Sequence, residues 1–239
     1  VDICYMLGLY YDMVAEEEHK AIVAGILDRF VGCVVDKNFQ LVDVDNKMTL
    51  WGNFSPDIPH QPLNALEMLA ALKTTYRITG KDRYRTAYHM LIDEHGYDDE
   101  VIMAKTIWPD MWNVIWDDKL ACKSYMQLIP YETDASLSNK YRMGLNRHQY
   151  VWAKSDYKHE GEIWFPMVYT VLTGENVVTE KTIEALKNMQ GFQRNKRMFS
   201  VTKDDGSTVQ MASEEEGHAA LMIRNYWFGR YYGMIDPSW

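Results

Sequence analysis

The chain offers acidic side chains at positions where acid/base chemistry could be done. Asp117 and Asp118 fall in the first turns of a helix predicted over 110–129. The positive end of a helix dipole favours an ionised carboxylate, so these residues suit a general base. Neighbouring residues on a helix point about 100° apart. We therefore expect Asp118 to face a site, with Asp117 supporting it or exchanged with it. Equally, both can be solvated acids of an ordinary helix N-terminus.

A second acidic group lies at the end of another predicted helix, over 81–94, where Asp93 and Glu94 are found. A carboxylate at the C-terminal end of a helix opposes the dipole, which favours its protonated form and suits a general acid. Glu94 is the first candidate for this acid and Asp93 the second. The alternative is that they cap a loop or pair with a cation. Asp2, at the start of the chain, is a further candidate for the same rim, or a frayed helix acid.

Several other chemistries are not supported by motifs. The seven histidines show no HExxH or other paired ligand spacing, so we expect no zinc site. Asp43 and Asp45 begin like a calcium loop, but Lys47 and Met48 occupy the next ligand and glycine positions. No Gly-rich phosphate loop and no GxSxG occurs, so we expect neither a metal nor a cofactor. The isolated cysteines Cys4, Cys33 and Cys122 predict buried free thiols.

Hydrophobic periodicity and punctuation by Pro and Gly predict the elements that must position these side chains. Pro62 at a first turn and Gly80 after the last turn mark one helix, and Ser213 with Glu216 forms a capping box for the last one. Two β-hairpins are expected around Asp45-Asn46 and Asp205-Gly206. Nine helices are predicted: 1–14, 16–36, 62–79, 81–94, 110–129, 134–154, 163–173, 179–190 and 214–233.

The connections between these helices alternate in length. Short corners lie at 14–18, 78–82, 131–136 and 172–179, and long connections at 38–61, 95–110, 155–162 and 191–213. Stacked helical hairpins have this pattern, with short corners on one rim and long loops on the other. Binding and catalysis are usually found on long loops. We therefore predict an all-α fold, a single (α/α) toroid domain over 1–239 with small β-hairpins in its long loops.

Net charge and hydropathy exclude two classes of binding partner. The formal net charge is −9, whereas a phosphate backbone requires a basic stripe, so nucleic acid is not expected. No run of eighteen or more apolar residues exists, so no membrane span is expected. The chain opens inside an apolar helical pattern without Met, so we expect part of the ring to precede it, and an export signal could belong to that part. Nothing in the sequence indicates an oligomeric state.

Several segments together resemble a known family. These are LYYDMVAEEEHK, LVDVDNKMTLWGNFSP, LNALEMLAALKTTYRITGKDRY, LIDEHGY, WDDKLA and YWFGRYYGMI. They resemble uncharacterised glycosyl hydrolases of the six-hairpin glycosidase-like superfamily, and the resemblance covers most of the chain. It implies an (α/α)6 toroid of twelve helices with a carbohydrate-facing cleft. The last segment departs from the family pattern at Tyr232, where that pattern has His. The resemblance provides no catalytic pair.

The expected function is glycoside hydrolysis by two carboxyl groups, acting on an oligosaccharide or glycoside. Tryptophans beside long loops could stack on sugar rings, and Asn, Ser and His side chains could bond to hydroxyls, although core packing explains each tryptophan singly. The candidate binding residues are Trp51, Asn53, Ser55, Asn64, His95, Trp108, Trp112, Trp116 and His218. The alternatives are a sugar epimerase or lyase on the same toroid, using His95, His218 or tyrosines, and a non-catalytic carbohydrate-binding protein.

Overall fold

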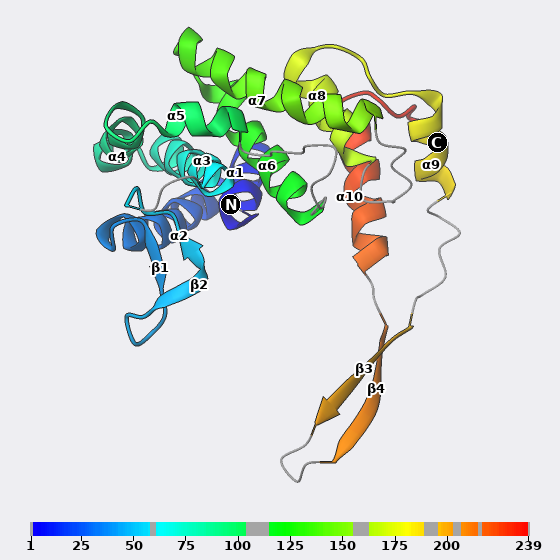
Figure 1. Cartoon of the computed structure of the whole chain (residues 1–239). Helices are drawn as coiled ribbons and strands as arrows, with labels where there is room; N and C mark the ends of the chain where they lie inside the picture. Colours follow the sequence, from blue (N-terminus) through cyan, green and yellow to red (C-terminus); the bar gives the residue numbers. More distant parts are fainter. Residues whose placement is uncertain are drawn as a thin grey trace. The chain divides into compact units, whose positions relative to one another are not determined.

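The structure is a computed structural model, and two compact units divide the chain, Val1–Ser155 and Asp156–Trp239 (Figure 1). The expectation of one toroid domain stays a prediction. The structure describes residues 2–57, 61–103, 115–154, 163–188, 196–202, 207–214 and 217–238.

The first unit is mostly helical, which confirms the all-α expectation at that level. Its β1 and β2 pair antiparallel around the turn that the sequence predicted, where Asn46 has a φ of 58°. The helices are α1 (Asp2–Met13), α2 (Glu17–Asp36), α3 (Pro62–Thr79), α4 (Asp82–Asp93), α5 (Tyr97–Glu100), α6 (Ile115–Leu128) and α7 (Ala135–Lys154), with 3-10 turns η1 (Val101–Met103) and η2 (Ile129–Tyr131) and strands β1 (Gln40–Val42) and β2 (Met48–Asn53).

Helix α3 is the central element of this unit. It packs against α1, α2, α4, α5 and α6. It begins with Pro62 and ends before Gly80, which takes the left-handed conformation at a φ of 67°, as predicted. Its middle is buried on nearly every side because the neighbouring helices surround it. The buried apolar residues of α3 are Ala65, Leu66, Met68, Leu69, Ala70, Ala71, Leu72 and Ile78.

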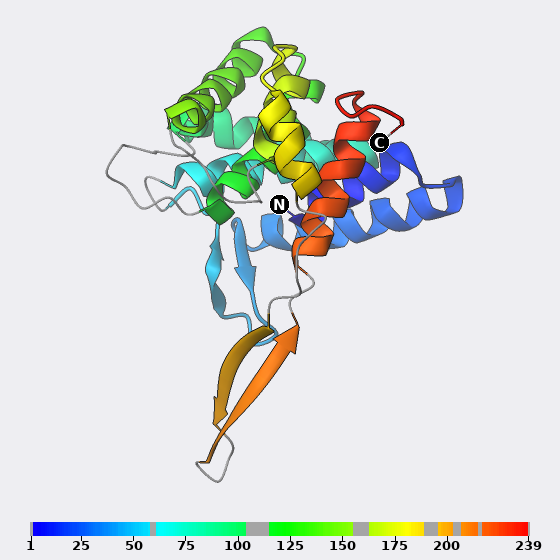
Figure 2. The ribbon, with the colours of Figure 1, turned by 90° about the vertical axis from the view of Figure 1, so that its right-hand side faces the viewer.

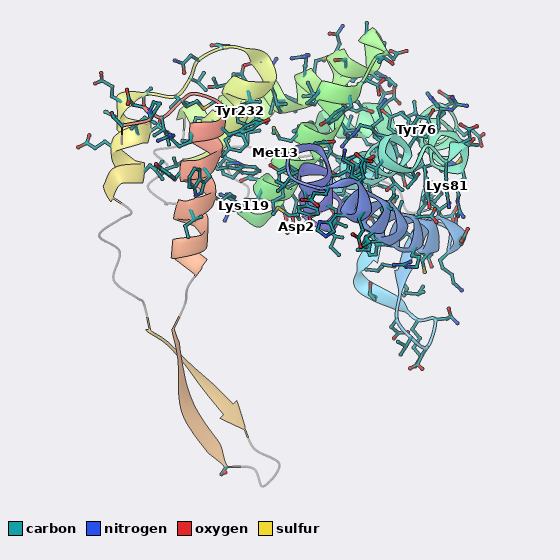
Figure 3. All side chains as sticks on the ribbon, turned by 180° about the vertical axis from the view of Figure 1, so that it is seen from behind. Asp2, Met13, Tyr76, Lys81, Lys119 and Tyr232 are labelled. Carbon is teal, nitrogen blue, oxygen red and sulfur yellow. The ribbon has the colours of Figure 1, made fainter. Side chains whose placement is uncertain are left out.

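The C-terminal ends of α1 and α3 meet the corner that follows α6. Arg77 of α3 bonds the carboxylate of Asp12 in α1, and the hydroxyl of Tyr131 donates to the same carboxylate at 2.9 Å. Lys123 of α6 pairs with Asp2 at the start of α1. Helices α1, α3 and α6 therefore run in the same direction, and Figure 3 labels Asp2 and Met13 at the two ends of α1.

The segments that follow α2, β2 and α4 also contact one another. The Tyr97 hydroxyl, after α4, donates to the carbonyl of Phe54, after β2, at 2.7 Å. The Phe54 amide donates to the carbonyl of Phe39, which follows α2. The sequence treated 95–110 as a loop, but 97–103 is helical and forms α5 and η1. Gly96, with a φ of 67°, ends the previous helix, and burial of Tyr97 and Val101 holds the following single turn.

The second unit contains α8 (Trp164–Thr173), α9 (Glu180–Asn188) and α10 (Gly217–Tyr231), with a small core of Ile163, Met167, Leu186 and Ile235. Strands β3 (Lys196–Thr202) and β4 (Thr208–Glu214) form the predicted second hairpin, a long two-stranded ribbon (Figure 2). Its turn, around Asp205-Gly206, lies outside the described residues.

Two sequence predictions are wrong at the level of single residues. Ser213 lies in β4 opposite Arg197, and α10 begins only at Gly217, so Ser213 does not cap that helix. Cys4 and Cys122 are buried free thiols as expected, but Cys33 is exposed because it falls on the outer side of α2. Among the described residues, every helix is too short or too polar to cross a bilayer.

Candidate functional site

The two acids at the start of α6 lie in different environments. Asp118 is fully buried, whereas Asp117 is partly exposed. This difference follows from the helical rotation of about 100° between neighbouring residues. Asp117 is therefore the member of the pair that can meet solvent or a ligand, while Asp118 lies inside the unit.

The acids at the end of α4 are placed differently. Asp93, Glu94 and His95 are all exposed. The Glu94 amide donates to the carbonyl of Met90 at 3.0 Å, so this residue ends the helix through its backbone. The structure does not bring the three side chains into the group of buried and partly buried charges found between α1, α3 and α6.

That group is centred on Glu67, in the buried middle of α3. The Glu67 residue is only 9% exposed. Burial raises the pKa of its carboxyl group, and the carboxylates of Asp2 and Asp117 raise this pKa further, while the amino group at the start of the chain and, less strongly, Lys123 oppose them. Asp2 comes from α1 and Asp117 from α6, two of the helices that pack beside α3. We call Asp2, Glu67 and Asp117 the carboxylate cluster.

A lysine and a thiol border the carboxylate cluster. The Lys123 Nζ lies 2.5 Å from the Asp2 Oδ1 atom. Cys4, in the first turn of α1, is fully buried, and burial raises the pKa of its thiol to about 11; the amino group at the start of the chain opposes this, and Glu67 adds a smaller increase. The thiol is thus protonated at neutral pH and borders Glu67 as a neutral group.

The three carboxylates are related by electrostatics and not by convergence on one point. Within the described ranges, no group of three or more His, Cys, Asp or Glu side chains is placed to hold a metal ion. Charge interactions reach farther than coordination bonds, so carboxylates too far apart to share a metal still shift each other's protonation. The arrangement provides one carboxyl group that favours its proton and neighbouring carboxylates that are more accessible.

Glu67 was not among the acids predicted from the sequence, because those acids all lie beside loops or at helix ends. The signal was nevertheless present. Glu67 is the one charged residue in the run from Ala65 to Leu72. A carboxylate on a helix that is apolar all round must be buried, and buried carboxylates are rarely retained without a specific role. Two of the predicted acids, Asp2 and Asp117, do join the cluster.

The candidate sugar-binding residues are only partly described. The Ser55 hydroxyl is buried, donates to Asp57 Oδ2 at 3.2 Å and accepts from Asn38 Nδ2 at 3.2 Å, so it holds its own loop. Asn64 is half-buried and donates to Gln61. The remaining candidates stay predictions: Trp51 and Asn53 lie in β2, Trp116 in α6 and His218 in α10, with side chains outside the described residues, and Trp108 and Trp112 lie wholly outside them.

The second unit has an open groove with a volume of about 840 Å³ beside α9. Its carboxylates, Glu180 and Glu184, lie one helical turn apart and are exposed to water. The groove therefore lacks a buried acid of the kind found in the carboxylate cluster, which is the stronger candidate for acid/base chemistry.

No family model matches the chain, and comparison with curated proteins and with solved structures yields no significant match.

Proposed function

We propose that this chain is a glycoside hydrolase that cleaves an oligosaccharide or glycoside by carboxylate acid/base catalysis. The observation that carries the proposal is Glu67, a buried carboxyl group neighboured by carboxylates from two other helices. Hydrolysis of a glycosidic bond requires one protonated carboxyl group and one ionised carboxylate on the two sides of the bond. The cluster supplies one buried carboxyl group that favours its proton and two more accessible carboxyl groups.

The proposed catalytic roles of Glu67 and Asp117 follow from how deeply each side chain is buried. Burial favours the protonated form of Glu67, which suits the acid that donates to the leaving oxygen. Asp117 is partly exposed and lies in the first turn of α6, so its carboxylate can meet a ligand. We assign Asp117 as the base or nucleophile, with Asp118 behind it. Glu67 thus takes the role that the sequence had suggested for Glu94.

The arrangement of helices supports an (α/α) toroid of the six-hairpin type as the scaffold. The first unit supplies three successive hairpins, α1 with α2, α3 with α4, and α6 with α7. Their first helices run in the same direction, which is the arrangement of the inner helices of such a ring. The contact between Arg77 and Asp12 joins the ends of α1 and α3 that lead into short corners. The contact between Tyr97 and Phe54 joins two of the long connections.

Turnover of glycosides tests the proposal. Purified protein is incubated with a panel of 4-nitrophenyl glycosides and with mixed oligosaccharides, and released nitrophenol and new reducing ends are measured. We expect hydrolysis by the native chain and a loss of on the order of 100-fold or more in Glu67→Gln, the usual effect of removing a general acid. Glu17→Gln, an exposed acid of α2, is the matched control. Rates in the native chain no higher than in Glu67→Gln would contradict the proposal.

A further inference from the structure

The open groove of the second unit has the size and the lining of a ligand site. Its walls come from α8, the connection 174–179, the first turns of α9 and the turn after α10. Its volume of about 840 Å³ lies within the range of roughly 300–1,000 Å³ that ligand sites have. The lining residues with hydrogen-bonding side chains are Thr170, Asn176, Thr179, Glu180, Glu184 and Tyr232.

The wall formed by the connection between α8 and α9 is held in place by its own hydrogen bonds. The Val177 amide donates to the Thr170 hydroxyl oxygen at 3.1 Å, which ties the connection to α8. The Val178 amide donates to Asn176 Oδ1, also at 3.1 Å. This second bond fixes the exposed Asn176 side chain and does not use its Nδ2 donor. Because these groups are ordered before a ligand arrives, binding costs less conformational entropy.

Tyr232 provides an aromatic wall. It follows the last turn of α10, is labelled in Figure 3 and is 37% exposed. The Tyr232 ring packs against the Phe228 ring, with centroids 4.7 Å apart, and lies 4.9 Å from the Tyr231 ring. Burial raises the pKa of the Tyr232 hydroxyl, which therefore keeps its proton at neutral pH. The groove thus has a supported apolar ring with a polar tip.

Glu180 and Glu184 give the groove two accessible acceptors. Both are exposed and lie one turn apart on α9. Among the described residues that line the groove, none is Lys, Arg or His, so phosphate and other anions are disfavoured. A carboxylate accepts strong hydrogen bonds from hydroxyl donors. The lining therefore favours a ligand that has hydroxyl groups and no negative charge.

We propose that this groove binds a neutral oligosaccharide. A sugar ring has an apolar C–H face for Tyr232 and hydroxyl groups for the two carboxylates. A sugar hydroxyl both donates and accepts, so it also satisfies the Nδ2 donor of Asn176. A polyamine would suit the carboxylates, but its protonated amines only donate and would leave that donor without an acceptor. The inference goes beyond the proposed function and does not depend on it, because none of these residues belongs to the carboxylate cluster.

Methyl NMR at Met234, which lines the groove, tests the inference at the site itself. The full chain is labelled with ¹³C at methionine methyl groups, and Met234→Leu identifies the signal. The neutral probes are cellohexaose, xylohexaose, mannohexaose and N-acetylated chitohexaose, and trigalacturonate and spermidine are the acidic and cationic probes. We expect at least one neutral probe to shift the Met234 signal saturably and to leave that of Met143, exposed on α7, in place. Measurements in Glu67→Gln as well as in the native chain guard against hydrolysis of the probe.

Matched variants assign the binding to the groove. We expect Tyr232→Ala to weaken it by on the order of 10-fold, whereas Tyr232→Phe keeps the ring and should bind nearly as tightly as the native chain. Glu184→Ala should also weaken binding by on the order of 10-fold. The controls are Trp227→Ala on α10 and Lys181→Ala on α9, exposed residues that do not line the groove and should bind like the native chain.

The outcomes separate this inference from the proposed function. Saturable binding that Tyr232→Ala weakens supports the inference even if no glycoside is hydrolysed. The inference is overturned if no neutral probe shifts Met234, or if only spermidine or trigalacturonate does. Native affinity in Tyr232→Ala, with circular dichroism like that of the native chain, overturns it as well. Hydrolysis without any response of Met234 would leave the proposed function standing and this inference wrong.

Discussion

Arg77 on α3 donates two parallel hydrogen bonds to the carboxylate of Asp12 on α1, at 2.6 and 2.9 Å. The guanidinium also lies 4.1 Å from the centre of the Tyr131 ring. Such two-pronged pairs fix geometry as well as contribute energy, because both planar groups must align. This contact therefore sets how α1 and α3 lie beside each other, and with them the positions of Asp2 and Glu67 toward the other ends of the same helices.

We expect Arg77→Ala to lower the free energy of unfolding by about 1–3 kcal/mol, since the Asp12 carboxylate loses both hydrogen bonds from a charged donor and the two side chains are only 24% and 27% exposed. Urea denaturation at neutral pH measures this. Arg85→Ala is the control, because its pair with Asp82 is exposed and should be worth less than about 0.5 kcal/mol. Equal losses in the two variants would contradict the role given to Arg77.

Glu67 should make the folded chain less stable as the pH rises. Its pKa is raised in the folded state, so the folded chain binds this proton more tightly than the unfolded chain does. The resulting stability is fully present below the ordinary glutamate value of 4.5 and is lost between that pH and the raised pKa. We expect Glu67→Gln to gain stability relative to the native chain across this window, by about 1.4 kcal/mol per pH unit of pKa difference. Urea denaturation at several pH values measures it, and a constant difference would contradict the raised pKa.

Glu132 should give the opposite pH dependence of stability, because its pKa is lowered in the folded chain. Burial alone would raise its pKa, but hydrogen bonds from the Asp134 amide, the Tyr88 hydroxyl and Lys73 outweigh burial and lower it. This stability is present above the ordinary value of 4.5 and is lost as the pH falls through the lowered pKa. We expect Glu132→Gln to cost about 3 kcal/mol at pH 7 and less in acid. The same series of urea denaturations checks this, and a cost that grows in acid would refute it.

Gly144 in α7 should not tolerate a side chain. A Cβ there would lie 2.3 Å from the Tyr125 hydroxyl oxygen and 2.7 Å from the Val101 carbonyl oxygen. The backbone oxygen cannot move away easily, so we expect Gly144→Ala to cost about 1–3 kcal/mol. Gly25→Ala in α2 is the control, because its nearest neighbour is the end of the Arg29 side chain at 3.7 Å. That substitution should stabilise the helix by up to about 1 kcal/mol, as Ala is the better helix former. Thermal denaturation of both variants measures the difference, and similar melting temperatures would contradict the close packing.

Local patterns predicted most of the helices, because periodicity and punctuation such as Pro62 and Gly80 act over a few residues. These local patterns gave wrong predictions where contacts between distant segments determine the secondary structure. The turn after Gly96 depends on burial of Tyr97, and Ser213 was drawn into β4 by pairing with Arg197. These contacts join residues from different segments, so propensity alone does not predict them.

The carboxylate cluster could be predicted only in part, because its residues come from different segments of the chain. Asp2 and Asp117 were recognisable as acids at helix starts, but their relation to Glu67 exists only because α1, α3 and α6 pack together. The chain could have revealed Glu67 as a lone acid in an apolar run. It could not have revealed which other carboxylates would surround it, since the three residues are far apart in the sequence.

The most direct test of the central claim compares leaving groups in Glu67→Gln. A general acid matters most when the leaving oxygen is a poor leaving group, because an acidic phenol departs without a proton. We predict that Glu67→Gln loses on the order of 100-fold or more in kcat/KM on an alkyl glycoside or oligosaccharide and far less on the matching 2,4-dinitrophenyl glycoside. Equal losses on both substrates, or no loss on either, would contradict the assignment of Glu67 as the general acid.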